Sequence, residues 1–304
     1  MATIEAQNIS KYYGKQKALS NINLTIKKGE VVGLLGPNGA GKSTLMKILT
    51  SFLPPTSGTA LINGVDVQEA SLDIRKLIGY LPENNPLYTD MYVKEYLRFV
   101  FDIYKNPGNP NQAVDRLIDL TGLQSEYKKK IGALSKGYRQ RVGLAQALIH
   151  DPEILIFDEP TSGLDPNQLI GIRKIITDLG KEKTVILSTH IMQEVEAVCD
   201  RVIIIDKGRI VADDATINLF KMAGNKQSFR VEFKEQFSEN ILNQLPFIDK
   251  VQLLSKNEWL IESKDNKDIR EDLFKFAVAN NYNVLSLIQE EQKMEDVFRR
   301  LTEQ

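Results

Sequence analysis

Hydrophobic and polar residues alternate in some segments of the chain and form unbroken apolar runs in others. Alternation at residues 3–9 and 22–26 predicts strands with one buried face. Unbroken runs at residues 31–35, 154–157 and 185–188 predict strands covered on both faces, as in a parallel sheet. Shorter apolar runs predict further strands at residues 58–62, 78–81 and 202–205. The chain therefore begins a sheet near its N-terminus and resumes it in its middle.

Apolar residues recur at helical spacing between these strands. The spacing predicts helices at residues 93–104 and 112–121. They are separated by the helix-breaking segment Pro107-Gly108-Asn109-Pro110. It also predicts helices at residues 170–179 and 191–198. Strands that alternate with helices are typical of a parallel α/β sheet. The helices within about residues 85–150 form a helical subdomain beside that sheet.

The composition changes near residue 222, and residues 224–228 have the composition of a linker. The pattern beyond it predicts the order strand, helix, strand, strand, helix, strand, which is ferredoxin-like. These elements are expected at residues 229–233, 238–245, 250–254, 259–262, 268–280 and 284–288. A closing amphipathic helix is expected at residues 294–301. We therefore predict an α/β domain at residues 1–222 and a small α+β accessory domain at residues 228–304.

The composition excludes several classes of protein. Lys and Arg number 39 against 40 Asp and Glu, so the net charge of −1 creates no field that attracts nucleic acid. No segment approaches the ~18 apolar residues that cross a bilayer. The first residues lack the basic and apolar parts of a secretory signal. Cys199 is the only cysteine, and its apolar context predicts a packed core thiol without a disulfide. These features predict a cytoplasmic protein.

A glycine-rich loop follows the run at residues 31–35 and precedes a helical pattern. It fits G-x-x-x-x-G-K-[ST], in which backbone N–H groups converge on phosphate oxygens. Lys42 is expected to bring a charge to the β- and γ-phosphates, and Ser43 to bring a hydroxyl to Mg²⁺. The predicted nucleotide-binding residues of this P-loop are Gly36, Pro37, Asn38, Gly39, Ala40, Gly41, Lys42, Ser43 and Thr44.

Two carboxylates end the apolar run at residues 154–157. Strands of such sheets end at the ligand crevice, so Asp158 and Glu159 are expected beside the bound phosphates. Asp158 is predicted to bind Mg²⁺ through water, and Glu159 to polarise the attacking water. A solvated acidic turn is the alternative, and the neighbouring P-loop argues against it.

The segment Leu134-Ser135-Lys136-Gly137-Tyr138 lies between these motifs. It resembles the L-S-G-G-Q signature of ATP-binding-cassette (ABC) ATPases, with Lys136 and Tyr138 as departures. The resemblance implies that Ser135 and Gly137 meet the γ-phosphate of an ATP bound by a second copy. Without it, Ser135 is a plain helix N-cap, and both interpretations use the same N–H groups.

Three more residues follow the order of the family. Asp165, in Ser162-Gly163-Leu164-Asp165, resembles the D-loop residue that lines the dimer seam. His190 follows an apolar strand and resembles the switch histidine that contacts the γ-phosphate. Tyr13 resembles the aromatic residue that stacks on adenine, with Tyr12 or a plain surface tyrosine as alternatives.

One position departs from the family in a way that affects the chemistry. Residues 78–83 match the Q-loop, but Glu83 replaces the usual glutamine. Attraction of this carboxylate to Mg²⁺ and repulsion from phosphate oppose each other, so the sequence does not fix the sign of the effect. Our hypothesis is that Glu83 ligates Mg²⁺ through water. His150 has no family context and is expected to be solvated.

The resemblance covers roughly residues 3–220 and implies an ATPase that uses ATP and Mg²⁺. In this family two copies pack head to tail around two ATP molecules. Lys42 and Mg²⁺ would neutralise developing charge, Glu159 would orient or deprotonate water, and His190 would hold the γ-phosphate. ATP favours the closed dimer because it contacts both copies, and hydrolysis returns the dimer to the open form.

A lone cassette implies a separate transmembrane permease subunit, so we expect a peripheral protein on the inner face of the cell membrane. Residues 85–92 are expected to receive the permease's coupling helix, with an interior loop as the alternative. The C-terminal domain resembles the extension of ABC-2-type exporter ATPases. The whole chain resembles the branch of these ATPases associated with bacterial gliding motility.

Two other functions remain open at this point. One is a soluble ABC ATPase that acts on the ribosome or DNA, although such relatives usually carry two cassettes or long coiled coils. The other is a regulatory module that binds ATP without turnover, which the presence of Glu159 and His190 argues against.

Overall fold

The computed structural model describes residues 2–104, 107–218, 227–264 and 267–290. The chain divides into two compact units, Met1–Thr216 and Ile217–Gln304, and each is described by itself. The closing helix predicted at residues 294–301 and most of the predicted linker lie outside the described residues. Within the described ranges, no helix is long and apolar enough to cross a membrane.

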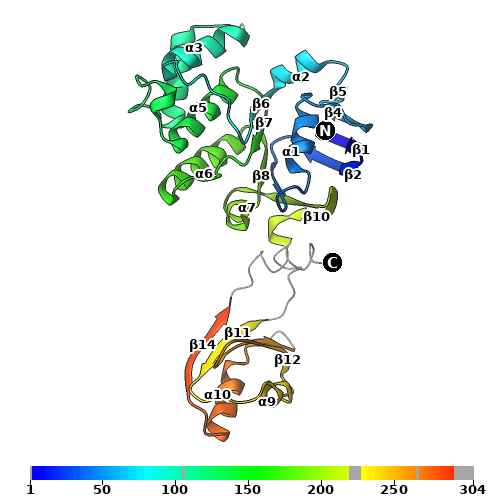
Figure 1. Cartoon of the computed structure of the whole chain (residues 1–304), viewed down its shortest axis with the longest axis vertical. Helices are drawn as coiled ribbons and strands as arrows, with labels where there is room; N and C mark the ends of the chain where they lie inside the picture. Colours follow the sequence, from blue (N-terminus) through cyan, green and yellow to red (C-terminus); the bar gives the residue numbers. More distant parts are fainter. Residues whose placement is uncertain (1, 105–106, 219–226, 265–266, 291–304) are drawn as a thin grey trace. The chain divides into compact units, whose positions relative to one another are not determined.

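A six-stranded sheet forms the centre of unit 1 (Figure 1). Its order is β10-β9-β3-β8-β7-β6, and all neighbours are parallel except the hairpin of β9 and β10. Every residue of β3, β7 and β8 is buried, which confirms the prediction from the unbroken apolar runs. The bounds are β3 (Val31–Leu35), β6 (Ile78–Leu81), β7 (Ile154–Asp158), β8 (Thr184–Thr189), β9 (Arg201–Asp206) and β10 (Arg209–Ala215).

A second, antiparallel sheet of order β2-β1-β4-β5 lies beside the first. Its strands are β1 (Ala2–Tyr13), β2 (Gln16–Lys27), β4 (Ser57–Ile62) and β5 (Val65–Asp66). Helix α1 (Lys42–Leu49) packs between the two sheets, and its Leu45 and Met46 are fully buried. One hydrophobic core therefore joins both sheets to the helix that begins at the P-loop.

Helices α3, α4 and α5 pack together as the predicted helical subdomain (Figure 1). Helices α6 and α7 cover strands of the parallel sheet. The short helix α2 was not predicted, because Ile74 is its only buried residue and it has no apolar stripe. The bounds are α2 (Ser71–Leu77), α3 (Val93–Tyr104), α4 (Pro110–Thr121), α5 (Lys136–Leu148), α6 (Pro166–Gly180) and α7 (Met192–Val198).

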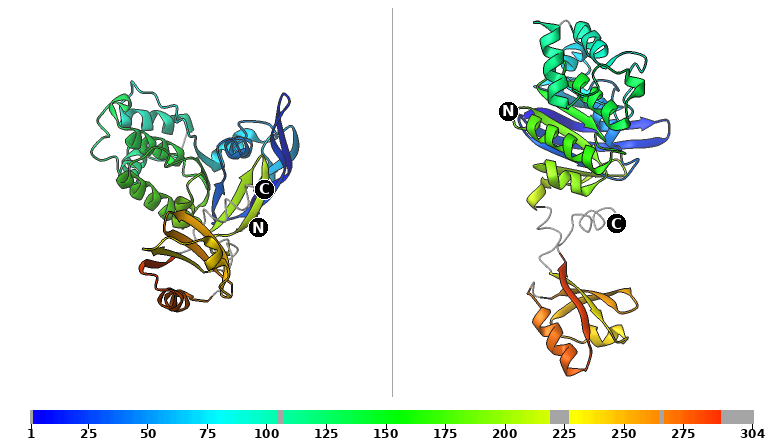
Figure 2. Two further views of the ribbon diagram at one scale, coloured as in Figure 1. Left: turned by 60° about the horizontal axis from the view of Figure 1, so that its bottom comes forward. Right: turned by 90° about the vertical axis from the view of Figure 1, so that its left-hand side faces the viewer.

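Unit 2 has the ferredoxin-like order that the sequence predicts (Figure 2). Its antiparallel sheet has the order β12-β13-β11-β14, and alternate residues such as Phe229, Val231 and Ile261 build the core against the helices. The elements are β11 (Ser228–Phe233), α9 (Glu239–Asn243), β12 (Ile248–Ser255), β13 (Glu258–Ser263), α10 (Arg270–Ala279) and β14 (Val284–Glu290).

Candidate active site

The glycine-rich loop lies between the end of β3 and the start of α1. Gly36 has no room for a side chain, because a Cβ there would meet the carbonyl oxygen of Ile205. Gly41, the N-cap of α1, has a φ of 111°, which favours glycine. Lys42 is buried, and its Nζ donates to the carbonyl oxygens of Gly36 at 2.7 Å and Pro37 at 3.2 Å. The lysine therefore holds the loop in a closed turn at the start of α1.

Asp158 ends β7 beside the start of α1. Its Oδ1 accepts hydrogen bonds from Ser43 Oγ at 3.1 Å and from Ser188 Oγ at 2.6 Å. The parallel register of β7 and β8 pairs Asp158 with Ser188, which explains the second contact. Asp158 is only 2% exposed, so these hydroxyl groups take the place of water at its carboxylate.

Glu159 is buried where the P-loop meets the end of β8. Its Oε1 lies 3.7 Å from Lys42 Nζ, and its Oε2 lies 2.9 Å from His190 Nδ1. Burial raises the pKa of Glu159 even though His190 and Lys42 oppose the shift. Burial likewise lowers the pKa of Lys42 against the attraction of Glu159. Burial therefore disfavours the charged form of both side chains.

Two buried side chains hold the backbone around His190. Thr189 Oγ1 donates to Glu194 Oε2 at 2.7 Å and accepts from the N–H of Ile191 at 3.0 Å. Glu194 is 2% exposed on α7. The side chain of His190 is 45% exposed, so it lies at the open end of the site with its Nδ1 directed to Glu159.

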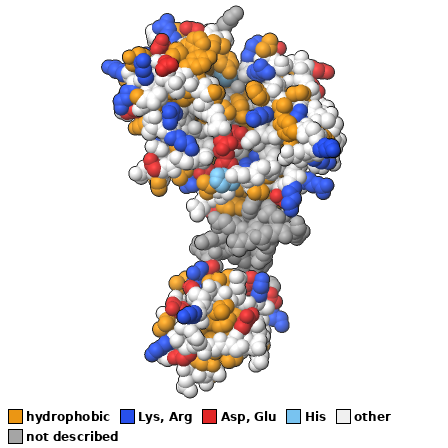
Figure 3. Space-filling view, viewed as in Figure 1, with side chains coloured by type: hydrophobic (Ala, Val, Ile, Leu, Met, Phe, Trp, Pro, Cys, Tyr) orange, Lys and Arg blue, Asp and Glu red, His pale blue; other side chains and the backbone are white. Residues whose placement is uncertain are grey.

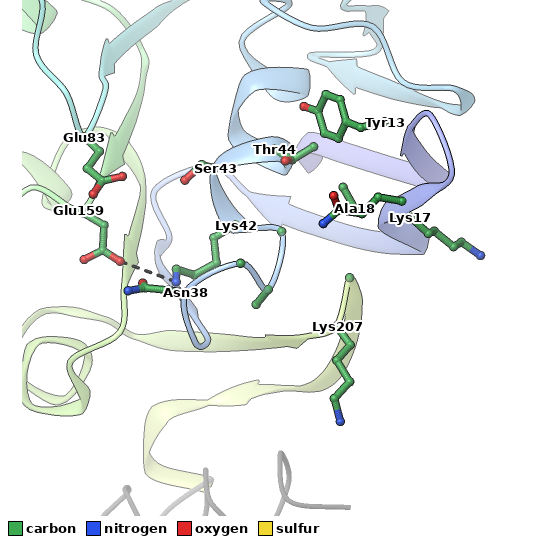
Figure 4. Close-up of a pocket in the computed structure, with 15 residues that line it drawn as sticks. Tyr13, Lys17, Ala18, Asn38, Lys42, Ser43, Thr44, Glu83, Glu159 and Lys207 are labelled. Atoms are coloured by element: carbon green, nitrogen blue, oxygen red, sulfur yellow. Dashed lines mark ion pairs between the residues drawn. The ribbon is translucent and has the colours of Figure 1, made fainter.

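A pocket of about 460 Å³ opens over the P-loop. Glu83 and Glu159 lie at one end of it and Tyr13 at the other, with the start of α1 between them (Figure 4). On the visible face of unit 1, acidic side chains gather near the middle (Figure 3). The predicted residues that line the pocket are Tyr13, Asn38, Gly39, Ala40, Gly41, Lys42, Ser43, Thr44, Glu83 and Glu159.

The other predicted residues of this region lie outside the lining. The carbonyl oxygens of Gly36 and Pro37 accept hydrogen bonds from Lys42. Asp158 is buried and accepts a hydrogen bond from Ser43, which itself lines the pocket. Tyr13 lines the pocket and is 48% exposed, whereas Tyr12 does not line it. The pocket therefore has room for a chain of phosphates between an aromatic ring and a pair of carboxylates.

Comparisons with known proteins decide the family. The family model described as ABC transporter matches residues 19–162. The bacitracin transport ATP-binding protein BcrA of Bacillus licheniformis is 33% identical over 98% of this chain and 96% of its own length. The linearmycin resistance ATP-binding protein LnrL of Bacillus subtilis (strain 168) is 32% identical over 98% of both chains. The chain belongs to the ATP-binding subunits of ABC transporters.

Solved structures agree with this assignment. The dimeric structure of a post-hydrolysis state of an ATP-binding cassette bound to ADP and Pi has a TM-score of 0.65 at 27% identity, covering 70% of this chain and 98% of that one. A bacterial Atm1-family ABC exporter with ATP bound has a TM-score of 0.66 at 25% identity, covering 73% of this chain and 40% of that one. The predicted ABC cassette fold is confirmed, and this ABC subunit is an ATP hydrolase.

Ser135, Gly137 and Asp165 do not line the pocket of this ABC ATPase. Ser135 is the N-cap of α5 and accepts from the N–H of Tyr138 at 3.4 Å. Asp165 is the N-cap of α6 and accepts from the N–H of Gln168 at 2.9 Å. Gly137 is buried, and a Cβ there would meet the Gln168 side chain. The two helix starts are therefore formed and in contact within one subunit, apart from its own P-loop pocket.

Sequence reasoning missed part of the pocket wall. Lys17 and Ala18 reach it from β2, and Lys207 and Gly208 reach it from the turn between β9 and β10. Gly208 N donates to the carbonyl oxygen of Ala40 at 2.9 Å, which holds this turn against the P-loop. The motif Asp206-Lys207-Gly208 predicts a turn, but nothing local indicates that the turn packs on residues far earlier in the chain.

The expectation that His150 is solvated is wrong. Its ring stacks on Tyr104 with centroids 4.0 Å apart, and its Nε2 lies 3.1 Å from the carbonyl oxygen of Ile78. Burial lowers the pKa of His150, which favours the neutral ring. It is a structural side chain that joins α3 to β6. The expectation for Cys199 is confirmed, since this free thiol is buried and burial raises its pKa.

Proposed function

We propose that this ABC subunit hydrolyses ATP with Glu159 as the base and drives an ABC-2-type exporter through closure of a dimer. The observation that carries the proposal is the buried Glu159 carboxylate at the end of the P-loop pocket, between Lys42 and His190. A carboxylate whose pKa is raised by burial is suited to accept a proton from water. His190, in contact with it, would hold the γ-phosphate at the open end of the site.

The P-loop would hold the triphosphate, with Lys42 as the charge at the β- and γ-phosphates. Tyr13, at the opposite end of the pocket from Glu159, would stack on adenine. Thr44 and the loop N–H groups complete the cradle. Catalysis then depends mainly on positioning the phosphate and water and on stabilising the charge that develops.

The oxygen atoms near Ser43, at the start of α1, are of the kind that binds Mg²⁺. The Ser43 hydroxyl and the Asp158 carboxylate are hydrogen-bonded to each other, and Glu83 lines the pocket nearby. Among the described residues, no group of three His, Cys, Asp or Glu side chains could hold a metal alone, so phosphate and water would complete the coordination. When bound, the metal would neutralise phosphate charge.

Glu83→Gln tests whether Glu83 contributes to that site. We expect the Mg²⁺ concentration for half-maximal ATP hydrolysis to rise by about 3- to 10-fold, because a carboxylate is replaced by a neutral amide. Hydrolysis is measured across an Mg²⁺ titration. Asp90→Asn, which removes another exposed carboxylate of the same loop region, is the control and should change nothing. Unchanged Mg²⁺ dependence and turnover in Glu83→Gln would exclude the role.

A second copy of the chain would complete each site. Ser135 and Gly137 lie at the start of α5, where free N–H groups favour an anion, and they lie outside their own subunit's pocket. In the proposed head-to-tail dimer they would meet the γ-phosphate held by the partner, with Asp165 at the seam. The dimeric cassette among the similar structures supports this arrangement.

A groove on unit 1 suits the coupling helix of a permease. It has a volume of about 470 Å³ and joins the region of α1 and β6 to the helical subdomain. Phe52, which lines it, is 71% exposed. None of the residues 85–92 beside it is buried, so the interior-loop alternative does not describe this segment. An exposed aromatic side chain in an apolar groove is typical of a protein interface.

Co-purification from membranes tests the permease. The tagged chain should bring down a polytopic membrane protein, and Phe52→Asp should reduce the yield of that protein at least about tenfold by placing a charge in the groove. ATP hydrolysis by the free subunit should persist. Val278→Asp changes a 61% exposed apolar side chain of α10 and serves as the control. If Phe52→Asp retains the membrane protein fully, the groove is not the docking site.

The named relatives support export. BcrA is a bacitracin transport protein and LnrL a linearmycin resistance protein, and both match nearly the whole chain, including unit 2. We therefore infer a place on the inner face of the cell membrane. The association with gliding motility stays a prediction. No observation favours action on the ribosome or DNA.

A further inference from the structure

Ser188 lies against Asp158 and Glu159, yet none of the motifs gives it a role. It is fully buried on β8, two residues before His190. Its Oγ donates to Asp158 Oδ1 at 2.6 Å and accepts from the backbone N–H of Glu159 at 2.9 Å. One hydroxyl therefore contacts both Asp158, the last residue of β7, and Glu159, which follows the strand.

The backbone of Glu159 requires such an anchor. Its φ of 50° lies in the left-handed region, which a non-glycine residue adopts only where its surroundings hold it. The bond from its N–H to Ser188 Oγ holds the start of this turn, and the bond from Ser162 N to its carbonyl oxygen at 3.1 Å holds the end. The turn directs the Glu159 side chain toward Lys42 and His190.

Asp158 shares the same hydroxyl. A serine hydroxyl has one hydrogen to donate, and at Ser188 this hydrogen goes to Asp158 while a lone pair accepts from Glu159. Ser43, the other donor to Asp158, also faces the pocket. Ser188 is fully enclosed, so its two bonds have no competition from water or ligand.

We propose that Ser188 is a positioning residue for ATP hydrolysis, which fixes the Asp158 carboxylate and the Glu159 backbone relative to each other. It acts through these two residues and does not touch ATP. The inference rests on the proposed role of Glu159 as the base. Loss of the hydroxyl leaves the buried N–H of Glu159 without its acceptor and lets the carboxylate move from its place beside His190.

Steady-state ATP hydrolysis by Ser188→Ala tests the inference. We expect kcat to fall on the order of 10- to 100-fold, because a misplaced base loses its alignment with water, while KM for ATP changes less than about threefold. Thr184→Val is the matched control. It removes another buried β8 hydroxyl that accepts a backbone N–H, from Gly29 at 3.0 Å, at the opposite end of the strand. Its kcat should stay within about twofold of the parent chain.

A double substitution separates positioning from general destabilisation. In a Glu159→Gln background the base is already lost, so adding Ser188→Ala should lower the residual rate by less than about threefold. A further loss equal to that of the single variant would show that Ser188 does not act through Glu159. If Ser188→Ala keeps the parent kcat while Glu159→Gln is inactive, this inference alone fails. If Glu159→Gln hydrolyses ATP normally, the proposed function fails as well.

Discussion

Glu159→Gln is expected to lower kcat for ATP hydrolysis by about 10³-fold while ATP binding persists. The amide keeps the shape of the side chain but cannot accept a proton from water, and general-base catalysis contributes roughly 10²–10⁴ in rate. Glu159 is only 7% exposed and its Oε2 lies 2.9 Å from His190 Nδ1, so bulk water cannot replace the carboxylate as the base. Single-turnover hydrolysis and equilibrium ATP binding, measured on the same protein, separate the chemical step from affinity.

A matched control comes from the other end of the same strand. Glu153 precedes β7, is exposed and lies 3.9 Å from Lys28. Glu153→Gln removes the same charge from the chain and should leave kcat within about twofold, since exposed ion pairs contribute little. If both variants lose hydrolysis equally, or if Glu159→Gln keeps the parent rate, Glu159 is not the base.

Lys42→Ala is expected to weaken ATP binding by about 10- to 100-fold and to lower kcat by on the order of 10²–10³. The substitution removes a buried cation that lies at the P-loop and also releases the carbonyl oxygens of Gly36 and Pro37. The loop then loses both its charge and the contact that closes its turn. Fluorescent-nucleotide titration and steady-state hydrolysis measure the two effects.

Lys207→Ala provides the comparison for Lys42. Lys207 also lines the pocket, but its side chain is 75% exposed and lies 3.6 Å from Asp206. Figure 4 shows its ammonium group directed away from Lys42 and Glu159. Its removal should change ATP affinity less than about threefold. An equal loss in both variants would mean that the pocket attracts ATP by general positive charge and not through the P-loop lysine.

The parts of the fold that depend on local pattern were predictable. The run at residues 31–35 became β3, and the helical spacing at residues 93–104 became α3. Helix α6 begins at Pro166, before the predicted start at residue 170, because Asp165 caps a polar first turn that apolar spacing does not detect. The separate antiparallel sheet was missed because alternation marks strands without showing their partners.

The candidate site shows the same division. The P-loop, Asp158, Glu159 and His190 carry motifs, and the structure brings their side chains into contact. Ser188 and Gly208 carry none, because their roles arise from strands and turns that are distant in sequence. His150 was misjudged for the same reason, since its partner Tyr104 comes from α3, far earlier in the chain.

In the proposed dimer, each ATP joins the P-loop of one copy to the start of α5 in another. Analytical ultracentrifugation of Glu159→Gln with ATP and Mg²⁺, with and without Ser135→Glu, measures whether this dimer forms. The second change places a negative charge where the γ-phosphate would lie, and Ser238→Glu alters an equivalent N-cap serine at α9 as the control. We expect ATP-dependent dimers for Glu159→Gln and for its Ser238→Glu derivative, and monomers that still bind ATP when Ser135→Glu is present. Equal ATP-dependent dimers in all three proteins, or no dimer in any, would exclude the proposed dimer.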